Sequence, residues 1–342
     1  LGLSLNSVSI IEVDNKMSLK VIWQHLCCLF IFGTVFKGAH WAYCALKIAK
    51  KLCKENQYDA IITKNSPSEL LGSYFKKKKG YKWIATWNDP YPTEKYPKPY
   101  GKGITAKLFI LEKPLLNQME RADFHIFPNQ RIRDYMRNYL NIPSEKTRII
   151  PHVVIPREHH DTPHENLRIV HLGNILPPRD AAPFLRALKE FIKNEQNAKI
   201  EIAFIGQTPQ SVKDFVNTTH LEKYVKVFPP VKYKESQQIL ESYDIQLIVE
   251  APCEEGIFLP TKVSDSMQLG KPIFTISPSV GVLNDLYKQG HISYFSSLHD
   301  EKNILSTLKQ VYNDFTNGRI KSSSLEESYS PRTIFLQYNE II

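Results

Sequence analysis

Apolar and polar positions along this chain follow two different periods, which predict helices and strands in alternation. Residues 38–54 carry Trp41, Ala45, Ile48 and Leu52 at three- and four-residue spacings, and this pattern predicts a helix with one buried face. Shorter, almost continuous apolar runs follow it. Runs of this kind are typical of parallel strands that are covered on both faces.

The first half of the chain continues as strand, helix and strand. The predicted segments are a strand at 58–63, a helix from 65–68 to the lysines at 76–79 and Gly80, a strand at 82–87, a helix ending near Arg121, and strands at 123–127 and 148–154. Alternation in this order indicates βαβ units and a parallel sheet.

The second half repeats the alternation after a polar, proline-bearing segment at 156–165. Its predicted segments are strands at 167–173, 199–205, 225–228, 245–249 and 272–276, a helix at 181–194 and a last helix at 331–342. This series predicts a doubly wound parallel sheet. We therefore divide the chain into a first domain (1–155), a linker (156–166), a second domain (167–328) and a terminal helix (329–342) that packs back toward the first domain.

Length and composition agree with two α/β domains. The 342 residues suit two units of roughly 150 residues each. Hydrophobic residues make up 42% and charged residues 23%, which argues against a disordered or fibrous chain. The longest apolar stretch, 21–36, contains Gln24 and His25 and is shorter than the roughly 20 apolar residues that span a bilayer. We expect it to be buried or interfacial, and we expect a cytoplasmic protein without a signal peptide.

Cysteine usage indicates the redox compartment of the protein, and net charge indicates the kind of partner that it binds. The five cysteines form no CxxC pair and leave an odd thiol, which favours a reducing compartment. The net charge of +9 favours anionic partners: nucleic acid, a phosphorylated substrate or an acidic membrane surface. No basic and aromatic interleaving supports nucleic acid, so we do not expect it as a partner.

Ligands of open parallel sheets bind at the carboxyl ends of the strands, and this rule selects residues 173–179, 206–208, 229–232, 251–265 and 277–281 of the second domain. We consider two of these segments in detail. In the first, Gly173 lets backbone amides approach a ligand and Arg179 supplies a cation, an arrangement that suits a diphosphate. An ordinary strand-to-helix turn with a surface arginine is the alternative. In the second, 254–265, Lys262 can neutralise phosphate and Asp265 can accept the hydroxyl groups of a ribose.

These residues carry a resemblance to a known family. Pro260-x-Lys262-x-x-Asp265, followed by Met267-x-x-Gly270-Lys-Pro272, resembles the P-x-K-x-x-E-(Y/A)-M-x-x-G-K-P motif of family 4 (group 1) glycosyltransferases of bacterial cell-surface glycan synthesis. The segments 254–256, 171–173 and 88–91 fall where that family has matching segments. The resemblance covers the second domain well, and the first from about residue 40.

Three features depart from the family pattern. The second-motif carboxylate is Asp265 where glutamate is usual, and Ile257 stands where many members have an earlier glutamate. Glu255 is our candidate to replace that glutamate from a shifted turn. The chain also lacks the opening strand and Gly-rich turn of the first domain, so we expect an incomplete amino terminus.

The resemblance implies the GT-B architecture, in which two Rossmann-like domains face each other across a cleft, and a glycosyltransferase that retains anomeric configuration without a bound metal or cofactor. The donor would be a nucleotide diphosphate sugar in the second domain, and the acceptor a glycan or lipid-linked hydroxyl group in the first. The residues that we assign are Glu255, Arg179 and Lys262 for catalysis, Gly173, Asn174, Gly206, Asp265 and Gly281 for the nucleotide sugar, and Asn88 and Asp89 for the acceptor side.

Two other functions stay open at this point. A sugar-nucleotide epimerase of the same fold would use the same donor site but would need acid and base groups in the cleft. A protein that binds nucleotide sugars without turnover would explain the departure at Ile257.

Several basic or histidine-bearing segments allow a plainer interpretation. Lysines 76–79, with Lys98 and Lys102, form a basic face that could draw the protein to the inner face of an anionic membrane, although lysines before Gly80 also suit a helix end. We expect His159, His160 and His164 to be solvated linker residues rather than metal ligands, and His125 and His171 to be core histidines.

Overall fold

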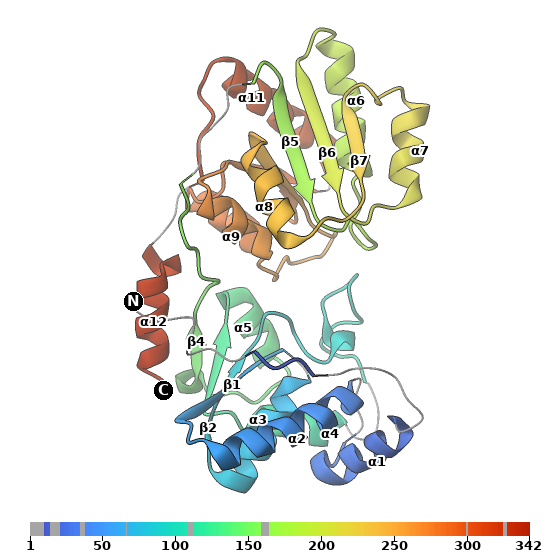
Figure 1. Ribbon diagram of the computed structural model, residues 1–342. Helices are drawn as coiled ribbons and strands as arrows, with labels where there is room; N and C mark the ends of the chain where they lie inside the picture. The colour runs from blue at the N-terminus through green and yellow to red at the C-terminus, as the bar shows by residue number, and fades with distance from the viewer. Residues whose placement is uncertain are drawn as a thin grey trace.

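Two α/β domains, each built on a parallel sheet, make up the structure (Figure 1). The computed structural model describes residues 10–13, 21–34, 38–65, 67–107, 112–158, 164–298, 300–323 and 327–342. His159 and His160 lie outside these residues. Within them, no helix has both the length and the apolar character needed to cross a bilayer.

The first domain contains a four-stranded parallel sheet in the order β1-β2-β3-β4. Its strands are β1 (Ala60–Lys64), β2 (Lys82–Thr86), β3 (Phe124–Phe127) and β4 (Thr147–Ile149), and its helices are α1 (Val21–Phe32), α2 (Ala39–Glu55), α3 (Ser68–Lys79), α4 (Glu112–Met119) and α5 (Gln130–Arg137). Trp83, Trp87 and Phe127 fill the core between the sheet and these helices.

Local sequence explains where these elements end. Gly80 adopts a left-handed conformation, and its N–H donates to the carbonyl of Lys76, so α3 ends as the glycine predicts. Asp123 then connects two elements, because it accepts the backbone N–H of Trp83 at 2.8 Å and pairs with Lys76. Asn129 caps α5 by accepting the N–H of Ile132.

The second domain contains a six-stranded parallel sheet in the order β10-β9-β8-β5-β6-β7. Its strands are β5 (Leu167–Leu172), β6 (Ile200–Ile205), β7 (Val225–Phe228), β8 (Ile245–Val249), β9 (Ile273–Ser277) and β10 (Tyr294–Ser297), and its helices are α6 (Ala182–Asn194), α7 (Gln210–Thr218), α8 (Tyr233–Glu241), α9 (Thr261–Gln268), α10 (Val282–Lys288) and α11 (Glu301–Thr316). The predicted doubly wound sheet is confirmed. Phe184, Phe204 and Phe274 pack edge to face in its core.

The chain returns to the first domain at its carboxyl end. Helix α12 (Pro331–Asn339) lies beside β4 (Figure 1), and Ile341 packs with Ile84, Ile126 and Ile150 of the first domain. The strand predicted at 148–154 is shorter than expected. Beyond β4, the N–H of Val154 donates to the carbonyl of Tyr329 at 2.9 Å, so this segment follows the returning chain instead of extending the sheet.

Both candidate core histidines are buried within strands. The Trp87 indole donates to Nδ1 of His125 at 3.1 Å, and Nδ1 of His171 lies 3.0 Å from the carbonyl oxygen of Leu247. Burial lowers the pKa of each imidazole to about 3. Both rings are therefore neutral at physiological pH.

Candidate active site

Two glycine turns meet at the carboxyl ends of β5 and β6. Gly173 has φ +117° and Gly206 has φ +149°, a backbone region that favours glycine. A Cβ atom on Gly206 would lie 2.2 Å from the carbonyl oxygen of Gly173, so a side chain cannot fit there. Asn174 joins the two turns, since its Oδ1 accepts the backbone N–H of Gln207 at 2.9 Å. The two turns together form a corner at the strand ends, where a ligand can approach the backbone.

Two cations and a buried carboxylate surround this corner. A Cβ atom on Gly173 would lie 3.0 Å from Nζ of Lys262, so the ammonium group sits directly over the turn. Glu250 follows β8 and is 5% exposed. Its Oε1 lies 3.7 Å from Nη2 of Arg179. The structure thus brings together Gly173, Arg179 and Lys262, which the sequence selected from segments about 90 positions apart.

Burial controls the charges of this cluster. It raises the pKa of Glu250, while Arg179 and then Lys262 act in the opposite direction. Burial also lowers the pKa of Lys262, and so does Arg179, whereas Glu250 raises it. Two cations beside one carboxylate leave a surplus positive charge at a half-buried position. Such a position favours an anionic ligand.

Asp265 lies one turn further along α9. Its Oδ1 accepts a hydrogen bond from the Tyr233 hydroxyl at 3.0 Å. Burial raises the pKa of Asp265, and the hydrogen bond from Tyr233 lowers it. Asp265 therefore presents a carboxylate beside the amino-terminal end of α8 and near Lys262.

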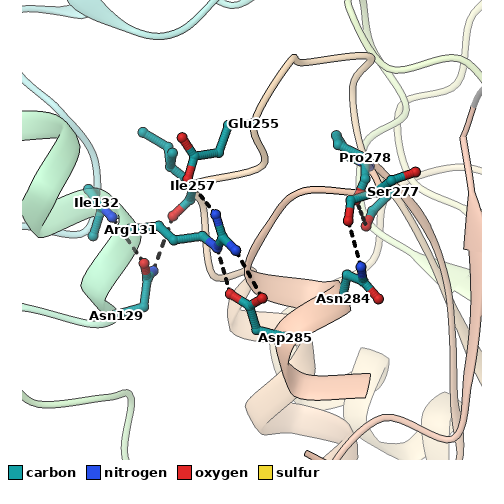
Figure 2. Close-up of polar contacts among 10 residues, drawn as sticks. Asn129, Arg131, Ile132, Glu255, Ile257, Ser277, Pro278, Asn284 and Asp285 are labelled. Atoms are coloured by element: carbon teal, nitrogen blue, oxygen red, sulfur yellow. Dashed lines mark hydrogen bonds and ion pairs between the residues drawn. The ribbon is translucent and has the colours of Figure 1, made fainter. Parts of the chain in front are cut away.

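Arg131, at the start of α5, connects the two domains (Figure 2). Its Nη1 donates to Glu255 at 2.5 Å, and its Nε and Nη2 donate to the two carboxylate oxygens of Asp285 at 2.5 and 2.9 Å. Asn129 adds a hydrogen bond from Nδ2 to the carbonyl of Ile257 at 3.1 Å. We call these contacts the Arg131 latch.

The latch gives Glu255 a partner that the sequence did not reveal. The structure pairs this carboxylate with Arg131, and a role toward the donor sugar stays a prediction. Gly281 is held nearby, because Gly256 and Gly281 form an isolated parallel bridge. A Cβ atom on Gly281 would lie 2.9 Å from the carbonyl oxygen of Gly256, so this close approach needs glycine.

Asn88 and Asp89 end the second strand of the first domain and face the second domain. Burial raises the pKa of Asp89, and Arg179 lowers it across the cleft. Asn88 lines an interdomain cavity of about 570 Å³, together with Thr261 and Asp265 of α9. Both acceptor-side candidates therefore lie opposite donor-side candidates.

Aromatic rings close the cleft around Arg179. The guanidinium carbon of Arg179 lies 5.6 Å from the ring centre of Tyr100, which belongs to the first domain. Phe258 of the second domain packs against Tyr96 and Tyr100, with ring centres 5.5 and 5.2 Å away. Its neighbour Ile257 is fully buried in the core of the first domain.

Three of these residues escaped the sequence reasoning. Glu250 comes directly after a predicted strand, so the strand-end rule would have found it one position before the segment that we selected. Arg131 and Tyr100 lie outside any motif, and only the contact between the domains reveals them.

Comparison with known proteins shows a family resemblance over the first part of the chain. Residues 29–158, most of the first domain, match the family described as Glycosyltransferase Family 4. Over these residues the chain is similar to that family. No curated protein matches the chain significantly by sequence.

Solved structures resemble this chain over both domains. HepE of Anabaena, in complex with UDP and glucose, has a TM-score of 0.60 at 14% identity, over 86% of this chain and 80% of HepE. Sucrose-phosphate synthase of Thermosynechococcus elongatus has a TM-score of 0.63 at 13% identity, over 89% and 78%. A glycosyltransferase of Rickettsia africae has a TM-score of 0.59 at 12% identity, over 86% and 80%. These likenesses confirm the GT-B fold.

Proposed function

We propose that this enzyme transfers a sugar from a nucleotide diphosphate sugar to a hydroxyl group of a glycan or lipid-linked acceptor. The observation that supports it best is the placement of Lys262 and Arg179 around the Gly173 turn. A glycosyl transfer of this kind must stabilise the charge that develops on the departing diphosphate. Fixed cations and backbone amides, already oriented before the reaction, can do so.

The donor side is assigned to the second domain. Lys262 and Arg179 bind the diphosphate, the turns at Gly173 and Gly206 let it approach the backbone, and Asp265 accepts the ribose hydroxyl groups. HepE was solved with UDP and glucose, and a pneumococcal O-GlcNAc transferase with UDP and GlcNAc. These complexes make UDP-sugars the first donors to test.

The acceptor side is assigned to the first domain. Asn88 and Asp89 face Arg179 and Asp265 across the cleft. A carboxylate at this position can accept a hydrogen bond from the attacking hydroxyl group and orient it toward the sugar. We propose retention of configuration without a metal ion, because the two cations supply the charge that a divalent ion would otherwise provide.

The proposed setting is cell-surface glycan synthesis at the inner face of a membrane. A lipid-linked acceptor presents its sugar at that surface, and the net charge of +9 favours approach to acidic lipid.

A panel of nucleotide sugars tests the donor assignment. A ligand present at 100 times its dissociation constant stabilises the folded state by about 2.7 kcal/mol, which raises the melting temperature measurably. We expect a shift with UDP-sugars, followed by donor hydrolysis or transfer to a hydroxyl acceptor. Binding without any turnover would instead indicate a non-catalytic nucleotide-sugar-binding protein, and interconversion of the donor would indicate an epimerase.

A further inference from the structure

Helix α1 is apolar except for Gln24 and His25, and it is covered on one side only. Cys28 and Phe32 are buried against the first domain, and the Cys28 thiol donates to the carbonyl of Ala39. Ile22, Leu26 and Phe30, spaced by four residues, are 75%, 46% and 86% exposed on the other side. Trp23 is 64% exposed beside them. We call these four side chains the α1 apolar face.

An apolar face of this kind needs an explanation. Single exposed apolar residues are normal, whereas a contiguous row on one helix marks an interaction surface. A helix that is apolar all round is expected inside a core or against lipid. Here the helix lies at the outer edge of the first domain, away from the second domain (Figure 1).

A basic pocket of about 670 Å³ adjoins the α1 apolar face. Phe30 contributes to its wall, and four cations line it: Lys50, Lys77, Lys78 and Arg121. No carboxylate is among its described lining residues. The ammonium of Lys50 lies 4.6 Å from the ring centre of Tyr74, which leaves it facing the pocket rather than an acid. An anion fits the charge of this pocket.

We propose that this surface binds a membrane containing anionic lipid. The basic pocket receives the phosphate of a lipid headgroup, and the α1 apolar face enters the interfacial region, where tryptophan and phenylalanine are favoured. Apolar side chains immediately beside cations that have no carboxylate among the described pocket lining match the apolar and anionic layers of such a membrane surface, and free phosphate would leave the apolar face uncovered. This inference specifies the surface for the membrane contact proposed above, and it does not depend on sugar transfer.

This surface differs from the one expected from the sequence. Lys98 and Lys102 do not line the pocket. Their loop contacts the second domain, through Tyr96 and Tyr100 against Phe258. Lys76 is engaged with Asp123. Of the predicted basic face, Lys77 and Lys78 therefore carry the proposal.

Co-sedimentation with vesicles tests the charge component. The protein is mixed with vesicles of phosphatidylcholine alone, or with vesicles that also contain roughly 30–40% phosphatidylglycerol, an anionic lipid. We expect binding only to the anionic vesicles. Each lysine near an acidic surface contributes about fivefold in affinity, so Lys77→Gln with Lys78→Gln should weaken binding roughly thirtyfold. Lys302→Gln with Lys309→Gln on α11, in the second domain, is the matched control and should bind like the parent.

A second pair of variants tests the apolar component. Phe30→Ser should weaken binding about tenfold or more, because an exposed aromatic ring gains its transfer free energy only in lipid. Leu336→Ser on α12, which is 51% exposed in the parent, is the control. All five residues changed on α1, α3 and α11 are exposed, and unchanged thermal melting verifies that the variants fold.

Three results would overturn the proposal. The first is equal binding to neutral and anionic vesicles, and the second is unchanged binding of the two test variants. The third is a self-association that Phe30→Ser abolishes, because a second copy of the chain would then cover the α1 apolar face. The assay needs no nucleotide sugar. Loss of vesicle binding therefore leaves the proposed transfer untouched, and absence of transfer leaves this surface untouched.

Discussion

At the scale of single residues, Lys262 is the cation that lies closest to the Gly173 turn. Changing Lys262 to Ala should weaken donor binding about tenfold to hundredfold, because a charge-assisted contact to phosphate contributes roughly 1.5 to 3 kcal/mol. Calorimetric titration with the donor found in the nucleotide-sugar panel measures the change. Lys213→Ala, an exposed lysine of α7, is the control.

Equal donor affinity in Lys262→Ala and the parent would refute this role. Lys262 would then act only as a charge near Asp265 at the start of α9.

Glu69 makes stability depend on pH. It is fully buried in the first turn of α3, neither carboxylate oxygen has a hydrogen-bond partner among the described residues, and burial raises its pKa to about 8. The folded state therefore holds this proton between pH 4.5 and 8 while the unfolded state releases it, so stability falls as pH rises through that window. Glu69→Gln removes the titration.

Urea denaturation at pH 6.5 and pH 8 checks this prediction. The buried histidines, whose pKa values lie near 3, do not titrate in this range once folded. The variant should gain on the parent by about 2 kcal/mol between the two pH values, since one pKa unit corresponds to about 1.4 kcal/mol. Parallel pH profiles would show that Glu69 is already ionised in the fold.

At the scale of elements, the close approach of β5 and β6 depends on Gly206. An alanine there would place its Cβ 2.2 Å from the carbonyl oxygen of Gly173. We expect Gly206→Ala to displace the Gly173 turn, lower the melting temperature and reduce donor affinity together. Gly318→Ala is the control, because Gly318 has φ +63° but open space around its Cβ position, so only about 1 kcal/mol of backbone strain is expected. A full donor affinity in Gly206→Ala would separate the turn from the donor site.

Most elements could be predicted from the sequence because their signals are local. Strands such as β8, with five consecutive buried residues, appear as apolar runs, and Gly80 marks the end of α3 directly. Strand β10 was not predicted, since its sequence Tyr-Phe-Ser-Ser is short and half polar, and its place at the sheet edge comes from pairing with β9.

The residues of the candidate site also differ in whether the sequence alone predicts them. Residues that follow strands, such as Gly173, could be selected from the chain alone, because parallel strands bring their carboxyl ends to one edge. Arg131 and Tyr100 could not, since each acquires its partner only when two separately folded domains meet.

At the scale of the whole molecule, the Arg131 latch connects the domains at a cleft. Arg131→Ala should leave each domain folded but weaken the closed arrangement, because both Glu255 and Asp285 lose their shared partner. We expect a larger radius of gyration in small-angle X-ray scattering. Arg133→Ala is the control, since Arg133 pairs with Asp134 on the same helix and contacts no acid of the second domain in the described structure. An unchanged radius would show that Phe258 and Ile257 hold the cleft closed without the latch.

The return of the chain to the first domain has a consequence for how this protein is made. Ile84, Ile126 and Ile150 precede the second domain in the sequence, yet the residue that covers them, Ile341, follows it and is synthesised only after it. During synthesis the first sheet therefore keeps an uncovered apolar surface while the whole second domain is being translated. Nascent chains of this protein should bind chaperones that recognise apolar segments until Ile341 emerges and covers the sheet.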